Sequence, residues 1–417
     1  MLFVTLLRSL IRDGQLTLID ANGHRHEIGG PPGRPVTIRL HDRRLHTLLF
    51  LRPRLMVGQA FMDGTLPVEQ GSIYDFLMLV MGNIETAPRS ALAPLWNGVS
   101  WASRHLHQYN PIGRARRNVA HHYDLSGGLY DLFLDADRQY SCAYFEQPDN
   151  DLEAAQLNKK RHIAAKLRLK PGMKVLDVGS GWGGLALYLA RETGVDVTGL
   201  TLSTEQHKLA TERAAEAGLA DRVRFKLQDY RAETGIYDRI VSVGMFEHVG
   251  LAYYGRFFQT LHDRLNEDGL ALLHAIGRRD GPGDTNPWIR KYIFPGGYAP
   301  ALSEVLPQIE RADLWVTDIE TLRLHYAETL RHWRLRFMAN RERAKALYDE
   351  RFCRMWEFYL SAAESTMRVG GQMVFQIQLS RRIDAVPITR DYMIDWERAE
   401  RRRSNMPDRQ TLLHRDD

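Results

Sequence analysis

The chain has 417 residues, of which 44% are hydrophobic, a formal net charge of +5 and two cysteines. This length and composition predict two or three domains with buried cores, while the cysteine count excludes a disulfide framework and favours the cytoplasm. No stretch of sequence is both long and apolar enough to cross a bilayer, so we expect any membrane contact to be peripheral. We expect no metal site and no nucleic-acid partner.

Residues 1–84 are predicted to form a small α+β domain. The first fifteen residues, 1–15, contain an apolar stretch that arginines interrupt, so they favour an amphipathic helix over a signal peptide or membrane span. Residues 14–23 and 34–40 are predicted as short strands, and residues 72–81 as a helix.

Residues 85–115 are predicted to be a linker. The run from Ala87 to Leu95 is rich in proline and small side chains, and it leads into an aromatic and basic connector. From residue 116 to residue 417 we expect a larger domain that carries the chemistry.

The segment Lys174–Ala190, KVLDVGSGWGGLALYLA, is the most informative part of the chain. Its apolar start predicts a buried parallel strand, and its end predicts an amphipathic helix. Between them, Gly179, Gly181 and Gly183 allow the backbone to turn sharply and to approach a ligand. The spacing differs from the G-x-G-x-x-G of dinucleotide-binding proteins, but the strand, turn and helix together predict a nucleotide-type cofactor site.

Three further strands are predicted within residues 195–206, 222–230 and 237–250. Strands that alternate with helices predict a doubly wound, Rossmann-like α/β sheet of parallel strands, which binds ligands at its carboxyl edge. The last two of these strands are expected to bring Asp229 and then Glu247 with His248 to that edge.

The expected cofactor is S-adenosylmethionine. No acidic residue directly ends the second strand, so we expect Thr201, Ser203 and Gln206 to hold the ribose. The alternative is a Rossmann-like domain in which the glycines only pack a helix against the sheet.

Residues from about 320 to 403 show long helical patterns rich in arginine and aromatic side chains. Arginine clusters are compatible with an anionic membrane surface as a partner, although a solvated helix face is the commoner explanation of any one cluster. The clusters are residues 39–46, 114–117, 334–345 and 400–403.

Several separated blocks resemble the cyclopropane-fatty-acyl-phospholipid synthases and the related enzymes that modify mycolic acids. The resemblance extends along nearly the whole chain and keeps the order of the blocks. They are HHYDLSGGLYDLFLD (121–135), QYSCAYF (139–145), VLDVGSGWGGLA (175–186), GLTLSTEQ (199–206), MFEHVG (245–250) and LLHAIG (272–277).

The resemblance implies a class I methyltransferase core with C-terminal helical additions, an N-terminal domain that helps to bind lipid, and a homodimer. The implied reaction moves a methylene unit from S-adenosylmethionine to the cis double bond of an acyl chain, in phospholipids at the inner face of the cytoplasmic membrane. Methyl transfer leaves a carbocation, and loss of a proton from the added methyl closes the ring. The implied base is bound bicarbonate.

Five residues match the family's bicarbonate site: Glu247 as the carboxylate, His274 as the imidazole, Tyr326 as the phenol, Ile276 through its backbone, and Cys142 beside the anion. Because like charges repel, we expect either a proton shared between Glu247 and the anion or donation from His274 and Tyr326. From position alone, Glu247 also fits a helix cap and His274 a hydrogen-bonded core histidine.

The resemblance also implies the contacts of the cofactor. Tyr140 and Ser141 are expected to close over the methionine end, and Asp229 and Tyr230 to flank the adenine. The remaining expected contacts are Asp177, Gly179, Gly181, Trp182 and Gly183 beneath the cofactor, and Thr201, Leu202, Ser203 and Gln206 at the ribose.

Aromatic faces attract both the sulfonium and a carbocation, so aromatic residues in this part of the chain are further candidates. A role in the hydrophobic core is the alternative for each of them. They are Phe145, Tyr292, Phe294, Tyr298 and Trp333.

The chain departs from the family pattern in three places. Ala363 stands where many relatives have a cysteine, and Cys353 is not an equivalent position, so a thiol there is not essential. Ser180 replaces a common cysteine of nearly the same size, and we expect little effect. The HYDLSGG block lacks the asparagine of many relatives, so the resemblance does not assign the acyl-entry loop.

Other functions remain open at this point. A sister enzyme on the same scaffold leaves a methyl or methylene branch, but retained Glu247, His274 and Tyr326 argue against it. The N-terminal domain and the arginine-rich helices disfavour a methyltransferase for a soluble small molecule. A non-catalytic lipid-binding protein is disfavoured because both halves of the site are retained.

Overall fold

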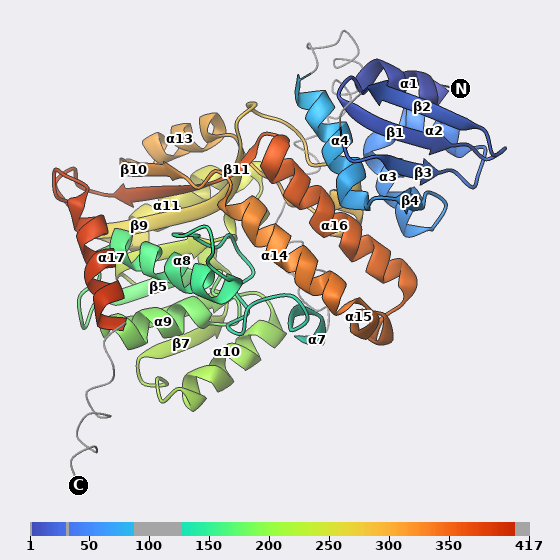
Figure 1. Ribbon diagram of the computed structural model, residues 1–417. Coiled ribbons are helices and arrows are strands. Elements are labelled where there is room, and N and C mark those ends of the chain that lie inside the picture. The colour runs from blue at the N-terminus through green and yellow to red at the C-terminus, as the bar shows by residue number, and fades with distance from the viewer. Residues whose placement is uncertain (1, 31–32, 87–126, 405–417) are drawn as a thin grey trace.

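The computed structural model describes residues 2–30, 33–86 and 127–404, and Figure 1 shows them as two parts that each have a sheet. The predicted linker lies outside the described residues from position 87 onward. The arginine cluster at 114–117 also lies outside them.

The N-terminal part is a four-stranded sheet with helices, in the strand order β2-β1-β3-β4. Its first helix is amphipathic and buries Phe3, Val4 and Leu7, which agrees with the prediction for the start of the chain. The helix predicted at 72–81 continues to Thr86. The elements are α1 (Leu2–Leu10), β1 (Gly14–Ile19), β2 (Arg25–Gly30), β3 (Val36–Arg39), α2 (Leu45–Leu51), α3 (Pro53–Met62), β4 (Val68–Gln70) and α4 (Ile73–Thr86).

The larger part is built on a seven-stranded sheet in the order β10-β11-β9-β8-β5-β6-β7. The predicted Rossmann-like core is confirmed. The five strands β9-β8-β5-β6-β7, in their order within the sheet, are parallel to their neighbours. The strands are β5 (Lys174–Val178), β6 (Asp196–Thr201), β7 (Val223–Leu227), β8 (Tyr237–Val243), β9 (Leu265–Arg278), β10 (Trp315–Thr321) and β11 (Gln372–Ser380).

One strand corrects the prediction of a wholly parallel sheet. Strand β11 runs antiparallel to both β9 and β10, and it lies inside the segment 320–403 that was predicted to be mainly helical. Its sequence QMVFQIQLS carries Gln376 and Gln378, both 1% exposed, so polar residues interrupt the apolar run that marks a buried strand.

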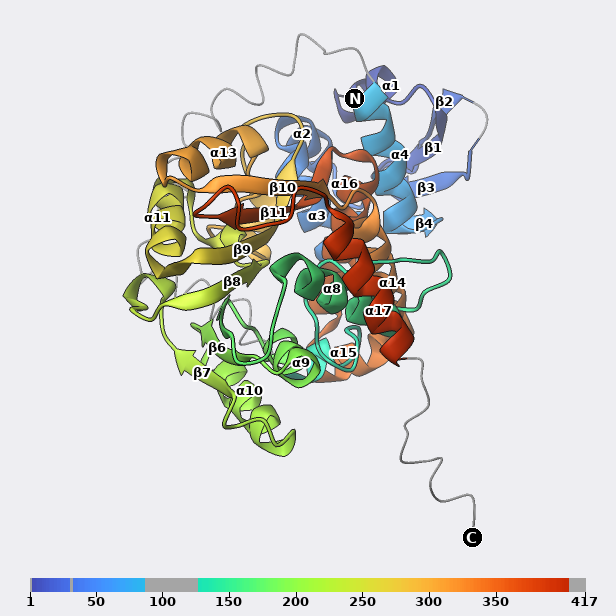
Figure 2. The ribbon, with the colours of Figure 1, turned by 90° about the vertical axis from the view of Figure 1, so that its left-hand side faces the viewer.

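Helices cover both faces of this sheet. Phe257 and Leu261 of α11 (Tyr254–Arg264) and Ile309 of α13 (Leu302–Arg311) share one apolar cluster with strand residues. Helices α8 (Leu152–Leu167) and α9 (Gly184–Thr193) contribute to a second cluster. Figure 2 shows α17 (Asp391–Ser404) lying along α8. Helix α10 (Thr204–Glu216) packs against β7.

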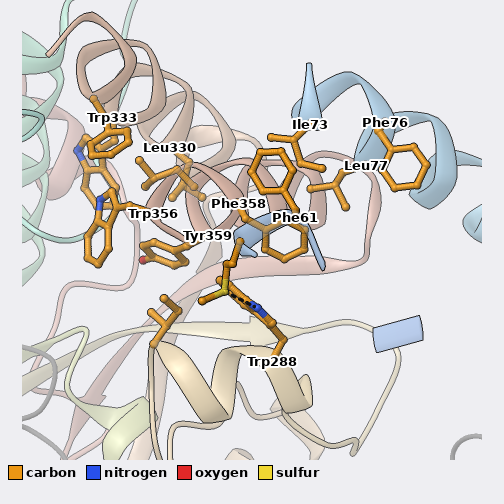
Figure 3. Packing of buried hydrophobic residues seen from close by; sticks show 14 of the residues in the cluster. Phe61, Ile73, Phe76, Leu77, Trp288, Leu330, Trp333, Trp356, Phe358 and Tyr359 are labelled. Carbon is orange, nitrogen blue, oxygen red and sulfur yellow. Dashed lines mark hydrogen bonds between the residues drawn. The ribbon is translucent and has the colours of Figure 1, made fainter. Parts of the chain in front are cut away.

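A shared aromatic core joins the two parts. The ring of Phe358, on α16 (Glu350–Val369), lies 6.2 Å from Phe61 and 4.6 Å from Trp288, measured between ring centroids (Figure 3). A Cβ atom at Gly58 would lie 2.6 Å from both Phe358 and Trp288, so glycine allows α3 to approach this closely. The remaining helices are α7 (Gly127–Tyr130), α12 (Pro287–Tyr292), α14 (His325–Ala339) and α15 (Arg341–Leu347), with the 3₁₀ helices η1 (Tyr230–Ala232), η2 (Phe246–His248) and η3 (Leu251–Tyr253).

Most arginines of the cluster at 334–345 pair with carboxylates of the same chain. Arg334 lies 2.8 Å from Glu364, and Arg336 lies 2.6 Å from Glu153. These ion pairs favour a structural role for the cluster over a free basic surface. Among the described residues, no helix has the length and apolar character that a membrane crossing requires.

Candidate active site

A cavity opens at the carboxyl edge of β5, β6 and β8, where the topology of an open α/β sheet places ligands. Two segments from outside this edge also contribute to it, residues 138–141 before α8 and residues 228–231 at η1. All the predicted cofactor residues except Gly183 and Ser203 line the cavity. They are Tyr140, Ser141, Asp177, Gly179, Gly181, Trp182, Thr201, Leu202, Gln206, Asp229 and Tyr230.

The glycine-rich turn presents bare backbone to the cavity. Gly179 and Gly181 have φ angles of +90° and +54°, which L side chains rarely adopt. No atom lies within 4 Å of the position that a Cβ at Gly181 would take, so a ligand can approach the backbone there. Gly183 differs from the prediction: it precedes α9, and a Cβ there would lie 2.6 Å from the ring of Phe225. Its role is helix packing.

The polar groups at the end of β6 are already arranged. The Thr201 hydroxyl donates a hydrogen bond to Oε1 of Gln206 at 2.8 Å, and both side chains line the cavity. Ser203 lies outside it, because its hydroxyl caps α10 by accepting from the Gln206 N–H at 3.3 Å. Of the three residues predicted at the ribose, Thr201 and Gln206 thus present polar atoms to the cavity, and Ser203 does not.

The adenine end contains a residue that the sequence analysis missed. Arg231 donates to both carboxylate oxygens of Asp229, at 2.8 and 2.7 Å, and lines the cavity. Its guanidinium lies 5.5 Å from the ring centroid of Tyr230 and 5.4 Å from that of Tyr253. This arrangement fixes the Asp229 carboxylate while leaving lone pairs on it for an amino group.

The opposite end of the cavity holds a buried carboxylate. Asp177 is 1% exposed, and no described residue is a hydrogen-bond partner of its Oδ2. Burial raises the pKa of Asp177 to about 7, although Lys159 opposes this rise. An ammonium group of a ligand satisfies this oxygen, and the methionyl part of S-adenosylmethionine carries one. The buried oxygen and the open glycine backbone thus fit the predicted cofactor.

Aromatic side chains close this end. The ring of Tyr140 stacks on Trp333 at 5.1 Å, and its hydroxyl lies 2.9 Å from the hydroxyl of Tyr359. Trp182 lines the cavity and also packs on Tyr130 with a centroid distance of 4.9 Å. Tyr140 and Trp182 therefore give the cavity an aromatic wall, which suits the sulfonium expected there.

None of the five residues predicted around bicarbonate lines this cavity. Glu247 lies in η2, with Oε1 accepting a hydrogen bond from the N–H of Ile276 at 2.6 Å. Its Oε2 has no partner among the described residues, and burial raises its pKa to about 7. The alternative role as a helix cap is not observed, because α11 starts at Tyr254 and its N-cap is Tyr253.

His274 occupies β9, two residues before Ile276 and opposite Val243 of β8. Its Nδ1 lies 3.1 Å from Nε2 of Gln376, whose Oε1 has no partner among the described residues. Burial lowers the pKa of His274 to about 3, so the imidazole is neutral. It is thus a hydrogen-bonded core histidine that lies on the same strand as the Glu247 contact.

Cys142 and Tyr326 belong to one hydrophobic cluster, against which Ile276 also packs. The N–H of Ala143, next to Cys142, donates to the hydroxyl of Thr329 on α14 at 3.0 Å, and Tyr326 lies on the same helix. The Tyr326 ring is edge-on to Trp333 at 5.9 Å. Burial raises the pKa of the Cys142 thiol, so this residue is a neutral thiol and not a nucleophile.

Two of the predicted aromatic candidates contact residues of the cavity wall. Trp333 stacks on Tyr140, and Phe294 lies 5.8 Å from the ring of His248 and 5.9 Å from that of Tyr359. The others pack elsewhere: Phe145 on His325 and His332, Tyr292 on Trp288, and Tyr298 through its hydroxyl on Glu304.

Several lining residues were missed by the sequence analysis although they adjoin predicted ones. Arg138 and Gln139 directly precede Tyr140, whereas His248, which also lines the cavity, was expected at this edge. Adjacency to a predicted block was the available signal. Ser180 also lines the cavity, whereas Ala363 lies half-buried on α16 against the hydrophobic core.

Comparison with known proteins places the chain in a family. The family described as mycolic acid cyclopropane synthetase matches residues 112–377. A probable fatty acid methyltransferase from Pseudomonas putida is 44% identical over 381 residues, which span 89% of this chain and 92% of the relative. The cyclopropane-fatty-acyl-phospholipid synthase of Escherichia coli K12 is 37% identical over 350 residues, or 84% and 89% of the two chains.

A solved structure agrees with this assignment. The mycolic acid cyclopropane synthase CmaA1, complexed with SAH and CTAB, has 35% identity and a TM-score of 0.61, with coverage of 65% of this chain and 99% of that one. The cavity described above lies in the matched core. The chain belongs to the mycolic acid cyclopropane synthetase family and is an S-adenosylmethionine-dependent methyltransferase of the cyclopropane fatty acid synthase type.

Proposed function

We propose that this protein is a cyclopropane-fatty-acyl-phospholipid synthase that uses bound bicarbonate as the base. The observation that carries the proposal is the state of Glu247. Its carboxyl group is buried, one oxygen is held by the N–H of Ile276, and the other has no partner among the described residues. A buried group of this kind has room for one more hydrogen-bonded ion.

The raised pKa of Glu247 removes the objection that a carboxylate repels an anion. With a pKa of about 7, Glu247 is partly protonated at neutral pH and is able to donate from Oε2. His274 is neutral and lies near the same strand end, so it adds no competing charge. These two groups together support the shared-proton form of the bicarbonate site.

The remaining residues of the site orient the two substrates and keep water away from them. S-adenosylmethionine, when bound, supplies an electrophilic methyl group. Tyr140 lines the cavity and is held by Trp333 and Tyr359, so an aromatic surface bounds the place where that methyl must meet an alkene. Alignment and a dry surrounding contribute most to such a transfer, because an alkene is a weak nucleophile. The aromatic faces also stabilise positive charge that forms on the acyl chain.

The name of one relative favours a second candidate. The Pseudomonas putida protein is called a probable fatty acid methyltransferase, so a methyl or methylene branch is the alternative product. Loss of a proton from a neighbouring chain carbon gives a methyl-branched alkene, and a hydride shift followed by loss of a proton from the added methyl gives a methylene branch. The retained Glu247, Ile276 and His274 group favours ring closure, since this group holds the proposed base.

We also propose that the substrate is an unsaturated phospholipid that the protein reaches by peripheral contact at the inner face of the cytoplasmic membrane. Leu335 and Met338 of α14 and Leu347 of α15 are exposed by 47%, 38% and 50%. Apolar side chains at this end of the helices suit insertion among lipid headgroups. Because most arginines of the adjoining cluster are paired internally, we expect binding to be weak and to depend only moderately on salt.

The deciding experiment is an incubation with trideuteromethyl S-adenosylmethionine and unsaturated phospholipid vesicles, with and without bicarbonate. Mass spectrometry and proton NMR of the released fatty acids then identify the product. Upfield ring signals, loss of one deuterium per transferred methyl and stimulation by bicarbonate are expected. A branched product would favour the alternative function. The absence of any lipid product would exclude both functions. Vesicle flotation at low and high salt tests the membrane step.

A further inference from the structure

A buried lysine stands behind the methionine end of the cavity. Lys159 of α8 is 1% exposed, and its ammonium donates hydrogen bonds to Oε1 of Gln139 at 2.6 Å and to Oγ of Ser141 at 2.9 Å. Both acceptors are neutral and both line the cavity. Within the described part of the chain, no carboxylate oxygen lies within the ion-pair distance of 4.0 Å from this ammonium.

The other cations at the cavity are different. Arg138 donates to both oxygens of Asp131, at 2.6 and 2.7 Å, and Arg231 is paired with Asp229 in the same way. Each guanidinium therefore already has its own carboxylate. A buried charge that lacks such a partner costs free energy unless a ligand provides the opposite charge.

Lys159 also determines how Ser141 faces the cavity. The ammonium occupies a lone pair of the Ser141 hydroxyl, so the hydroxyl proton is left to point away from Lys159. Ser141 lines the cavity, and Asp177 lines it as a carboxylate whose Oδ2 has no described partner. One wall of the cavity thus presents the Ser141 hydroxyl, to which Lys159 is bonded, together with the carboxyl group of Asp177.

The amino-acid part of S-adenosylmethionine is a zwitterion with one ammonium and one carboxylate. We propose that Lys159 is a positioning residue that selects this zwitterion: it supplies the charge for the methionyl carboxylate through Ser141, while Asp177 takes the methionyl ammonium. The proposal rests on the use of S-adenosylmethionine and is independent of whether the lipid product is a ring or a branch.

The charges around Lys159 are consistent with this role. Burial lowers its pKa to about 8, and the carboxylates of Asp135 and Asp137 act in the opposite direction, while Lys160 adds to the lowering. The thiol of Cys142 also faces it. Lys159 in turn acts on Asp177 and on the buried His274. The ammonium of Lys159 is thus the central cation among these groups.

The test compares two ligands by isothermal titration calorimetry at pH 7.5. S-adenosylhomocysteine carries the zwitterion, whereas 5′-methylthioadenosine carries the same adenosine and sulfur without it. Lys159→Met is expected to weaken S-adenosylhomocysteine binding about tenfold to a hundredfold, as for loss of a hydrogen-bonded charge, and to change 5′-methylthioadenosine binding by less than about threefold. Ser141→Ala is expected to show the same pattern with a smaller loss.

The matched control is Lys160→Met. Lys160 is 7% exposed on the same helix, but it pairs with Asp137, which keeps Arg213 as a second partner. This variant is expected to change neither affinity by more than about threefold. Equal weakening of both ligands by Lys159→Met and by Ser141→Ala, or unchanged S-adenosylhomocysteine binding, would overturn the proposal. Failure of the wild-type protein to bind S-adenosylhomocysteine would instead overturn the cofactor assignment.

Discussion

The cofactor cavity and the buried group around Glu247 differ in how their polar atoms are satisfied. In the cavity, Thr201 is bonded to Gln206 and Asp229 to Arg231, so these contacts are arranged before a ligand arrives, while Oδ2 of Asp177 has no partner among the described residues. Around Glu247 and Gln376, oxygen atoms lack partners among the described residues. The cavity thus combines paired polar groups with open space, whereas the group around Glu247 is buried and only partly paired.

The largest effect is expected for Glu247→Gln. The amide keeps the size and the contact with Ile276 but does not provide the carboxyl group that shares a proton with bicarbonate. Turnover is expected to fall about a thousandfold, in the range of a lost acid–base group. S-adenosylhomocysteine affinity should stay the same, because Glu247 does not line the cavity. Retained turnover with retained bicarbonate stimulation would show that the group around Glu247 does not hold the base.

The second prediction concerns the pH dependence of bicarbonate stimulation. The pKa of Glu247 is raised to about 7, so the group is protonated below this pH and charged above it. Bicarbonate affinity, expressed per bicarbonate ion present, is therefore expected to fall as pH rises through 7, by up to about tenfold per unit. Initial rates at pH 6.5 and 8.5 over a bicarbonate series measure this. A slope that persists in Glu247→Gln would assign the titration to another group.

Asp177→Asn tests the only buried carboxylate that we place at the methionine end. The variant is expected to bind S-adenosylhomocysteine about tenfold more weakly at pH 8, since the attraction to the ammonium is lost. In the wild type, the pKa of about 7 means that affinity falls as pH decreases below 7 and Asp177 becomes protonated. Calorimetry at pH 6 and pH 8 checks both statements. 5′-Methylthioadenosine, which lacks the ammonium, should bind with no such pH dependence.

The smallest effect is expected for Ser180→Cys, which restores the residue common in the family. The Ser180 hydroxyl makes one long hydrogen bond, 3.3 Å to the carbonyl of Leu200, and the side chain is buried. A thiol has nearly the same volume, so cofactor affinity and turnover should change by less than about twofold. A tenfold change in cofactor affinity would mean that binding depends on the side chain at position 180 as well as on the glycine backbone of the turn.

Local patterns were sufficient for the cofactor edge. Lys174–Ala190 predicts a strand, a glycine turn and a helix because apolar spacing and glycine content act over short distances. The residues that follow β6 and β7 were identified for the same reason, since each lies directly after a predicted strand. The sequence pattern joins all these glycines in one motif, and only the structure separates Gly181, which lines the cavity, from Gly183, which packs against Phe225.

Long-range packing was beyond the sequence patterns. Strand β11 escaped prediction because its buried glutamines bond to His274 and to other neighbours that the sequence does not place nearby. Lys159 escaped it because a lysine on a helix is normally exposed, and only the packing of α8 against residues 139–141 buries it.

The sequence by itself determined the class of sheet, the cofactor edge and the family, since these depend on short motifs and their order. The tertiary structure decided which buried polar atoms of the described residues have a partner and which do not. It also decided that most arginines of residues 334–345 serve the fold. The physical reason is that burial and pairing, which set charge states, arise only when distant segments pack together.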